Sequence, residues 1–197
     1  GVLFLGVGGL FLFMALSSNS FRSSQNLQDL AFPVTVLALV SIGVAFGLMS
    51  GVIDLSVGAI MGVCGVIMAG LVSVTGVPSP LALIIVAVSG MLLGLINGVL
   101  VTKLRAPSFI ITLGTLGLFR IGAFRIQFEF FGVAQSVHMF NDSLNWFGRG
   151  NGLGGLPVAF YLCIGIALLG YYVLAHSKLG LWIIAVGGNE RAAYDSG

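Results

Sequence analysis

Polar side chains that could do chemistry are few in this sequence, and the segment Ser50–Gly58 contains the most informative ones. Asp54 and Ser56 lie in a long apolar stretch whose nearest other charged residues are Asp29 and Lys103. A carboxylate in such a stretch is costly unless it has a partner. Asp54 therefore has two open interpretations. It could cap the N-terminus of the next helix by accepting hydrogen bonds from its first amides, or it could mark a broken helix near a translocation path or gate.

Two further polar side chains lie in apolar runs. Asn97 could hydrogen-bond across a helix interface or line a polar pathway, and Arg120, near the end of a span, needs a partner or water. The hydroxyls of Thr112 and Thr115 can return to the preceding helical turn and so say little about function. The candidate pathway or broken-helix residues are Asp54, Ser56, Asn97 and Arg120.

Catalytic and cofactor motifs are absent from the sequence. It contains no Ser–His–Asp set, paired carboxylates, phosphate-binding Gly-Lys loop or metal-ligand spacing. We therefore predict a transporter subunit and not an enzyme, with no cofactor bound by this chain. The net charge of +2, without a basic tract, gives no indication of nucleic-acid binding.

The composition indicates what must position these residues. The chain is 58% hydrophobic and 7% charged, whereas soluble domains carry about 25% charged residues. A spanning helix needs about 20 mostly apolar residues. The apolar runs predict an all-α, polytopic transmembrane helix bundle in one domain over residues 1–197. The predicted spans are Gly1–Leu16, Pro33–Gly51, the run from the Ile53–Ser56 break to Val72, Leu81–Val101, Pro107–Phe124 and Pro157–Ala175.

Glycines recur at helical spacing in two of these spans. One stripe is Gly43, Gly47 and Gly51, and the other is Gly90, Gly94 and Gly98. Small residues every fourth position let helix backbones approach closely in membranes. We predict that both stripes are helix-packing surfaces.

Basic residues in short loops predict the orientation. Lys103 and Arg105 lie in the tight loop between two spans, and such loops stay in the cytoplasm. Counting spans places Lys178 and Arg191 on the same side. There, residues Asn189–Ser196 predict a short polar helix that Asn189 caps. It could lie in a groove of a peripheral partner or be an ordinary surface helix.

Three ordered motifs resemble those of permeases in ribose- and xylose-type ABC importers. Ser50–Gly58 is similar to the Ser-Gly-Gly-Ile-Asp-Leu-Ser-Val-Gly signature, with Val52 where the second glycine is usual. Phe109–Thr115, followed by Arg120, resembles the next signature. Residues 187–197 resemble the family's cytoplasmic coupling segment. The matching residues are Gly187, Gly188, Asn189, Ala192, Ala193, Ser196 and Gly197.

The resemblance implies a multi-pass subunit of the bacterial inner membrane that works by alternating access. It also implies partners: a second permease subunit, two cytoplasmic ATPase subunits that bind ATP and Mg²⁺, and a periplasmic or lipid-anchored substrate-binding protein. Because the sequence stops inside the coupling motif, the resemblance further implies a permease fragment that is incomplete at its C-terminus.

Other functions stay open at this point. The substrate could be a ribose-like monosaccharide, a signalling sugar or a branched-chain amino acid. Phe128–Gly132 departs from the family's usual Gly- and Pro-containing pattern, which weakens inference about substrate and docking. A secondary transporter or channel would need no ATPase, but Asp54 is its one candidate for an ion-coupling carboxylate.

Overall fold

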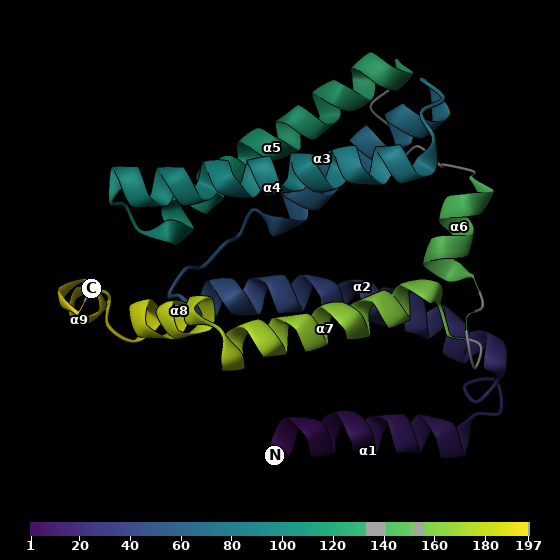
Figure 1. Ribbon diagram of the computed structural model, residues 1–197. Coiled ribbons are helices and arrows are strands. Elements are labelled where there is room, and N and C mark those ends of the chain that lie inside the picture. Colours follow the sequence, from purple (N-terminus) through teal and green to yellow (C-terminus); the bar gives the residue numbers. More distant parts are fainter. Residues whose placement is uncertain (133–140, 151, 153–155, 197) are drawn as a thin grey trace.

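The computed structural model describes residues 1–132, 141–150, 152 and 156–196 and is helical throughout its regular elements (Figure 1). The predicted all-α fold is confirmed. The helices are α1 (Val2–Ser17), α2 (Ser24–Met49), α3 (Val57–Ser73), α4 (Ser79–Leu104), α5 (Ser108–Phe131), α6 (Asp142–Arg149), α7 (Val158–His176), α8 (Lys178–Gly188) and α9 (Glu190–Asp195).

Every predicted span forms a helix, but the lengths differ. Among the described residues, α2, α4, α5 and α7 are long and apolar enough to cross a membrane, whereas α1, α3 and α8 are shorter apolar helices. The span predicted to start at Pro33 begins earlier in the structure, because α2 already begins at Ser24. The Ser23 side chain accepts a hydrogen bond from the Asn26 amide and caps that earlier start.

The fifth span, predicted to end at Phe124, also extends further in the structure. Helix α5 continues to Phe131 and ends at Gly132, whose positive φ of 68° suits a glycine cap. Helix α6 then forms where Asn141 accepts a hydrogen bond from the Leu144 amide at 3.0 Å. The Ser79 hydroxyl also donates to Asn141 Oδ1, at 3.2 Å, and this bond ties α6 to the start of α4.

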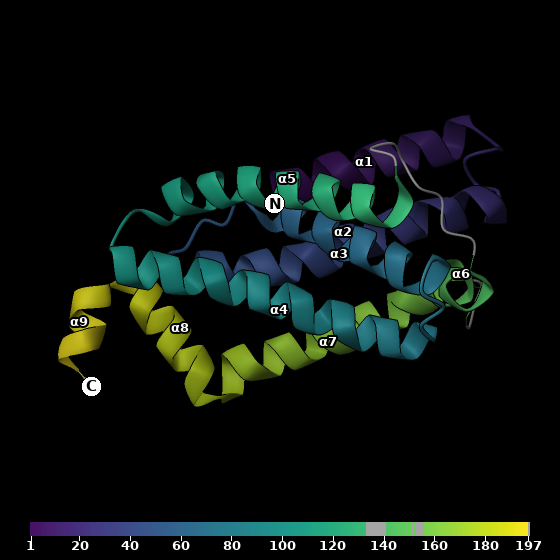
Figure 2. The same cartoon turned by 90° about the horizontal axis from the view of Figure 1, so that it is seen from above.

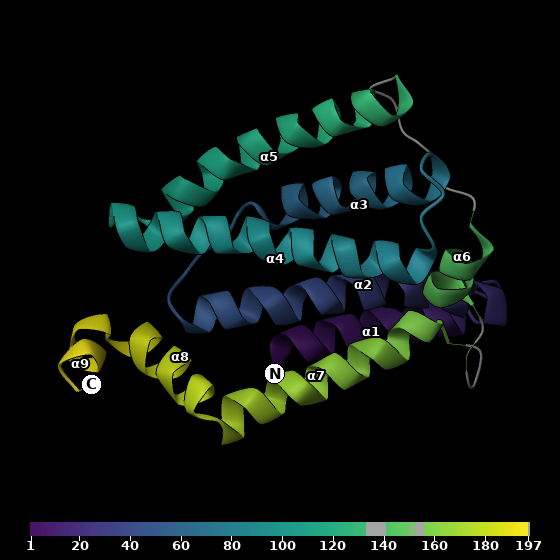
Figure 3. The ribbon, with the colours of Figure 1, turned by 45° about the horizontal axis from the view of Figure 1, so that its top comes forward.

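The helices form two packed groups (Figures 1 and 3). Helix α3 packs most extensively against α5 and then α4, and α2 packs against α7. Helix α1 has no buried residue. The segment between α2 and α3 crosses from one group to the other, so its residues connect two bodies that otherwise make few contacts with each other.

The loops gather at two opposite ends of the molecule. The α4–α5 loop, with Lys103 and Arg105, lies at the end that also holds α8 and α9. The α1–α2 turn, the α3–α4 turn and α6 lie at the other end (Figure 1). The α4–α5 loop thus shares one end with the helices that carry Lys178 and Arg191, as the basic loops predicted.

Helix α8 was not predicted. Ser177 ends α7 and caps α8, since its hydroxyl oxygen accepts a hydrogen bond from the Gly180 amide at 3.2 Å. The chain turns sharply between α7 and α8, so the axes of the two helices form a corner (Figure 2). A Cβ on Gly180 would lie 2.5 Å from Leu174 Cα, so only glycine fits the corner without moving backbone atoms.

Gly70 provides a test of the α3–α5 packing. An ideal Cβ on Gly70 would lie 2.5 Å from ring carbons of Phe130, on α5. We expect Gly70→Ala to destabilise the protein by about 1–2 kcal/mol, because overpacking forces neighbours out of their rotamers. Thermal unfolding in detergent measures this. Gly65→Ala is the matched control, because its Cβ would meet no atom of the described residues within 4 Å. Equal melting temperatures for the two variants would contradict the packing.

Candidate functional site at the broken-helix segment

Helix α2 ends in a glycine cap that starts the broken-helix segment, residues 50–56. The Val52 amide donates to the Gly47 carbonyl at 2.9 Å and the Gly51 amide to the Leu48 carbonyl at 3.0 Å. Gly51 has φ of +80°. These are the two hydrogen bonds and the left-handed residue of a Schellman motif. The motif stops α2 and sends the chain out in an extended conformation.

Two hydroxyls of α5 then hold the extended residues. The Ile53 amide donates to Ser108 Oγ at 3.0 Å, and the Leu55 amide donates to Thr112 Oγ1 at 3.1 Å. The Thr112 hydroxyl also lies 3.1 Å from the Ile53 carbonyl and 2.9 Å from the Ser108 carbonyl, to which it can donate. Thr112 is buried, so these bonds replace water for backbone groups that no helix satisfies.

Asp54 and Ser56 form the polar centre of the segment. The Ser56 amide and hydroxyl each donate to Asp54 Oδ1 at 2.7 Å. The predicted cap was wrong in detail: Ser56 is the N-cap of α3, and the carboxylate bonds to Ser56 itself and not to the first-turn amides. Asp54 thereby stabilises the turn that precedes α3.

Asn97 joins this centre from α4, as the interface interpretation predicted. Its Nδ2 donates to Ser56 Oγ at 2.7 Å, and both side chains are buried. In both of its bonds with Ser56, Asp54 Oδ1 is the acceptor. The Ser56 proton therefore points to Asp54, its oxygen accepts from Asn97, and the Asn97 amide orientation is fixed. Asn97 Oδ1 is consequently left buried without a hydrogen-bond partner within the described chain.

Two hollows flank α3 and the broken-helix segment. One, of about 270 Å³, lies beside Asp54 and is lined along α2 by Gly43 and Gly47. The other, of about 420 Å³, lies between α3 and α5. Its lining residues are Leu55, Gly58, Ala59, Gly62, Val66, Leu116, Arg120, Ala123, Phe124 and Gln127.

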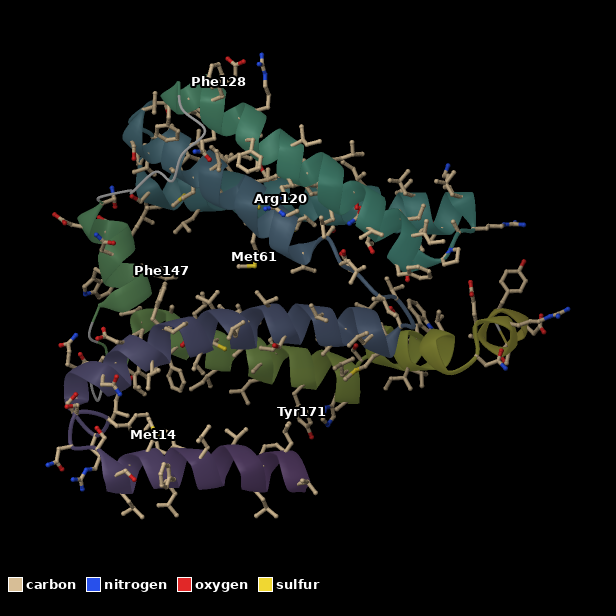
Figure 4. The ribbon with its side chains drawn as sticks, turned by 180° about the vertical axis from the view of Figure 1, so that it is seen from behind. Met14, Met61, Arg120, Phe128, Phe147 and Tyr171 are labelled. Carbon is tan, nitrogen blue, oxygen red and sulfur yellow. The ribbon has the colours of Figure 1, made fainter. Side chains whose placement is uncertain are left out.

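Arg120 lies between α5 and α3 in this second hollow (Figure 4). Its guanidinium has no ion pair with any residue that the structure describes. The structure therefore brings Asp54, Ser56 and Asn97 together in one network, and places Arg120 in the larger hollow, where it borders Leu55 of the same segment.

The predicted coupling residues lie at the end of the molecule that holds the α4–α5 loop. Asn189 Oδ1 accepts from the Ala192 amide at 3.0 Å, which confirms the predicted cap of the short polar helix, α9. Ala192, Ala193 and Ser196 line a groove of about 750 Å³ between α8 and α9. Gly187 and Gly188 end α8, and Gly197 lies outside the described residues.

The glycine stripes contact little within this chain. A Cβ on Gly90 would lie 3.4 Å from Cys64 Sγ, and one on Gly47 would lie 3.4 Å from the Val52 carbonyl. A Cβ on Gly43, Gly94 or Gly98 would meet nothing within 4 Å among the described residues. Gly51 lies beyond the end of α2 and so is not on its helical face. The packing role of the open positions stays a prediction.

Sequence reasoning missed Ser108 and underrated Thr112. A threonine in a helix usually satisfies its own hydroxyl, and the Thr112 hydroxyl does lie within reach of Ser108. Its second role, with the broken-helix segment, depends on a contact between residues far apart in sequence. The one available signal was that Thr112 belongs to a motif, Phe109–Thr115, that accompanies the Ser50–Gly58 motif.

The fold and the site define a multi-pass membrane protein with a hydrogen-bonded break between two helices and a capped polar helix at one end. A family model described as "Branched-chain amino acid transport system / permease component" matches residues 26–197. The chain belongs to this family. Its family membership and its long apolar helices together place the protein in the inner membrane.

Curated relatives match nearly the whole chain. The ribose import permease protein of Bacillus subtilis is 36% identical over 98% of the chain and 59% of the relative. The D-allose transport system permease protein of Escherichia coli is 34% identical over 94% and 55%, respectively. The ribose import permease protein of Haemophilus influenzae is 31% identical over 95% and 57%. The chain thus spans between half and three fifths of their length. No solved structure matches.

Proposed function

We propose that this chain is part of the permease subunit of an ATP-driven importer for a ribose-like monosaccharide. Membership in the permease family, with ribose and allose permeases among the relatives, carries the proposal. A branched-chain amino acid is the less favoured substrate, because the relatives named here import sugars.

The hollow that contains Arg120 supports a sugar as cargo. A guanidinium offers five N–H donors, which suit the several hydroxyl oxygens of a monosaccharide, and Phe124 provides an aromatic face. Gly58 and Gly62 keep the α3 side of the hollow open. We propose that the sugar passes this hollow between alternating inward- and outward-open states.

ATP and Mg²⁺ would be bound by partner ATPase subunits, because the sequence has no phosphate-binding loop. The α8–α9 groove and the capped helix α9 are the proposed contact for that partner. The opposite end, with α6, would face the substrate-binding protein, and a second permease subunit would complete the pathway.

Reconstitution tests the function. The complete gene product is assembled in lipid vesicles with a candidate ATPase and a candidate binding protein, and uptake of radiolabelled ribose, allose and leucine is measured. We expect ATP-dependent uptake of one of the sugars. Uptake of leucine alone would overturn the sugar assignment, and uptake that needs no ATP would overturn the importer class.

Arg120 gives a sharper prediction in the same vesicles. We expect Arg120→Gln to lower sugar uptake about tenfold, because a lost charge-assisted hydrogen bond costs about 1.5–3 kcal/mol. Arg125→Gln is the matched control: Arg125 is on the same helix but pairs with Glu129 at 2.6 Å in an exposed position. Equal uptake by the two variants would contradict the role of Arg120.

A further inference from the structure

The last residues of α8 lie directly against the end of α2. A Cβ on Gly187 would overlap the carbonyl oxygen of Met49 and lie 2.8 Å from its carbonyl carbon. From the other side, a Cβ on Gly51 would lie 3.7 Å from Gly187 Cα. The two backbones therefore touch without a side chain between them, where α2 gives way to the broken-helix segment (Figure 3).

The contact is specific to one position. At the next residue, Gly188, a Cβ would meet none of the described residues within 4 Å, although Gly188 belongs to the same helix. Helix α9 begins at Glu190, and Asn189 is the one residue between α8 and α9. Only Gly188 and Asn189 therefore separate Gly187 from the first residue of α9.

The path on the other side is equally short. Gly51 is followed by the extended residues whose amides bond to Ser108 and Thr112 on α5. Ser56, at the end of the segment, bonds to Asn97 on α4. A displacement of Met49–Gly51 would reach the α3–α5 group through these hydrogen bonds, whereas α7 belongs to the other group.

We propose that the Gly187–Met49 backbone contact is where movement of α9 is passed to the Asp54 segment, which makes Gly187 and Gly51 positioning residues for transport. The proposal rests on the proposed function, because it needs a partner that moves α9. Movement of α9 can also pass along the backbone, through α8 to α7. The Gly187–Met49 contact is a second route, and it leads to the helices that line the Arg120 hollow.

Alanine substitution of single glycines provides the test. Gly187→Ala and Gly165→Ala are compared in the complete permease, reconstituted with its ATPase and binding protein. We expect Gly187→Ala to lower uptake about tenfold while ATP hydrolysis stays within about twofold, as loss of a typical coupling free energy predicts. Gly165→Ala, on α7, should keep both activities, because its Cβ would meet nothing within 4 Å among the described residues. Normal uptake by Gly187→Ala would overturn the proposal.

A second measurement decides the result if Gly187→Ala does not assemble. Met49→Cys and Gly188→Cys are introduced with Cys64 and Cys163 replaced by alanine, and a short reducible thiol cross-linker joins them. Cross-linking should stop uptake while hydrolysis continues, and a reductant should restore uptake, which a folding defect would not allow. Undiminished uptake in the cross-linked protein would overturn the proposal. If the unmodified permease shows no ATP-dependent uptake at all, the proposed function itself has failed.

Discussion

Gly180→Ala is expected to destabilise the protein by about 3 kcal/mol, at the upper end of the cost of overpacking. Its Cβ would lie 2.5 Å from Leu174 Cα and from the Val173 carbonyl oxygen, and these backbone atoms cannot move aside as a flexible side chain could. Relief requires opening the corner between α7 and α8. That movement would also separate Gly187 from Met49.

Thermal unfolding in detergent and binding of the ATPase partner measure the two consequences. We expect a clear loss of melting temperature and loss of ATPase binding. Gly165→Ala, on α7, is the control, since its Cβ would meet nothing within 4 Å in the part of the chain that the structure describes. A Gly180→Ala variant as stable as Gly165→Ala would show that the corner tolerates a side chain.

Ser56→Ala is expected to destabilise the fold by about 1–2 kcal/mol. The substitution removes the acceptor of Asn97 Nδ2 and one of the two hydrogen bonds to Asp54 Oδ1. An unpaired buried donor costs about 1–3 kcal/mol, while hydrogen bonds between membrane helices average about 0.6 kcal/mol with a maximum near 1.7. Asn97 Oδ1 already lacks a partner, so the variant would leave that amide with no recorded hydrogen bond in the described chain.

A double-mutant cycle separates the loss of the Ser56–Asn97 hydrogen bond from the effect of the changed side-chain volume. Asn97→Leu alone should also destabilise, but Ser56→Ala together with Asn97→Leu should recover part of the loss, because both ends of the bond become apolar. Chemical or thermal unfolding of the four proteins in the same detergent gives the coupling energy. Strictly additive effects would contradict the Ser56–Asn97 hydrogen bond.

The sequence was most informative where a local rule decides the structure. Apolar run length predicted a helix at each of the six positions, four of which are long enough to cross a membrane. Asn189 followed by Glu190 predicted α9 and its cap. Helix α6 was missed because its eight residues include two aromatics, an arginine and a glycine, with no long apolar run. Helix α8 was missed because its apolar residues follow α7 closely and nothing in the sequence separates the two except the Ser177 cap.

The sequence predicted which residues form the site better than it predicted the contacts between them. Asp54, Ser56 and Asn97 were singled out because polar residues in apolar runs need partners. Which partner each would find depended on the packing of α3 between α4 and α5, and no local pattern encodes such a contact. The Gly187–Met49 contact was out of reach for the same reason, since glycines in membrane helices are common and only the neighbouring backbone shows which one is needed.

The division into two helix groups bears on how the protein is made. Helices α3, α4 and α5 follow one another in the chain, so they can pack together in the membrane soon after α5 has left the ribosome. Helix α2 packs mainly against α7, and α3, α4, α5 and α6 are synthesised between them. In the folded chain, Ser108, Thr112 and Asn97 bond to the broken-helix segment and so link the end of α2 to α4 and α5. The hydroxyl and amide bonds around Asp54 would thus act during biogenesis as a temporary tether, which keeps α2 near the place that α7 later fills.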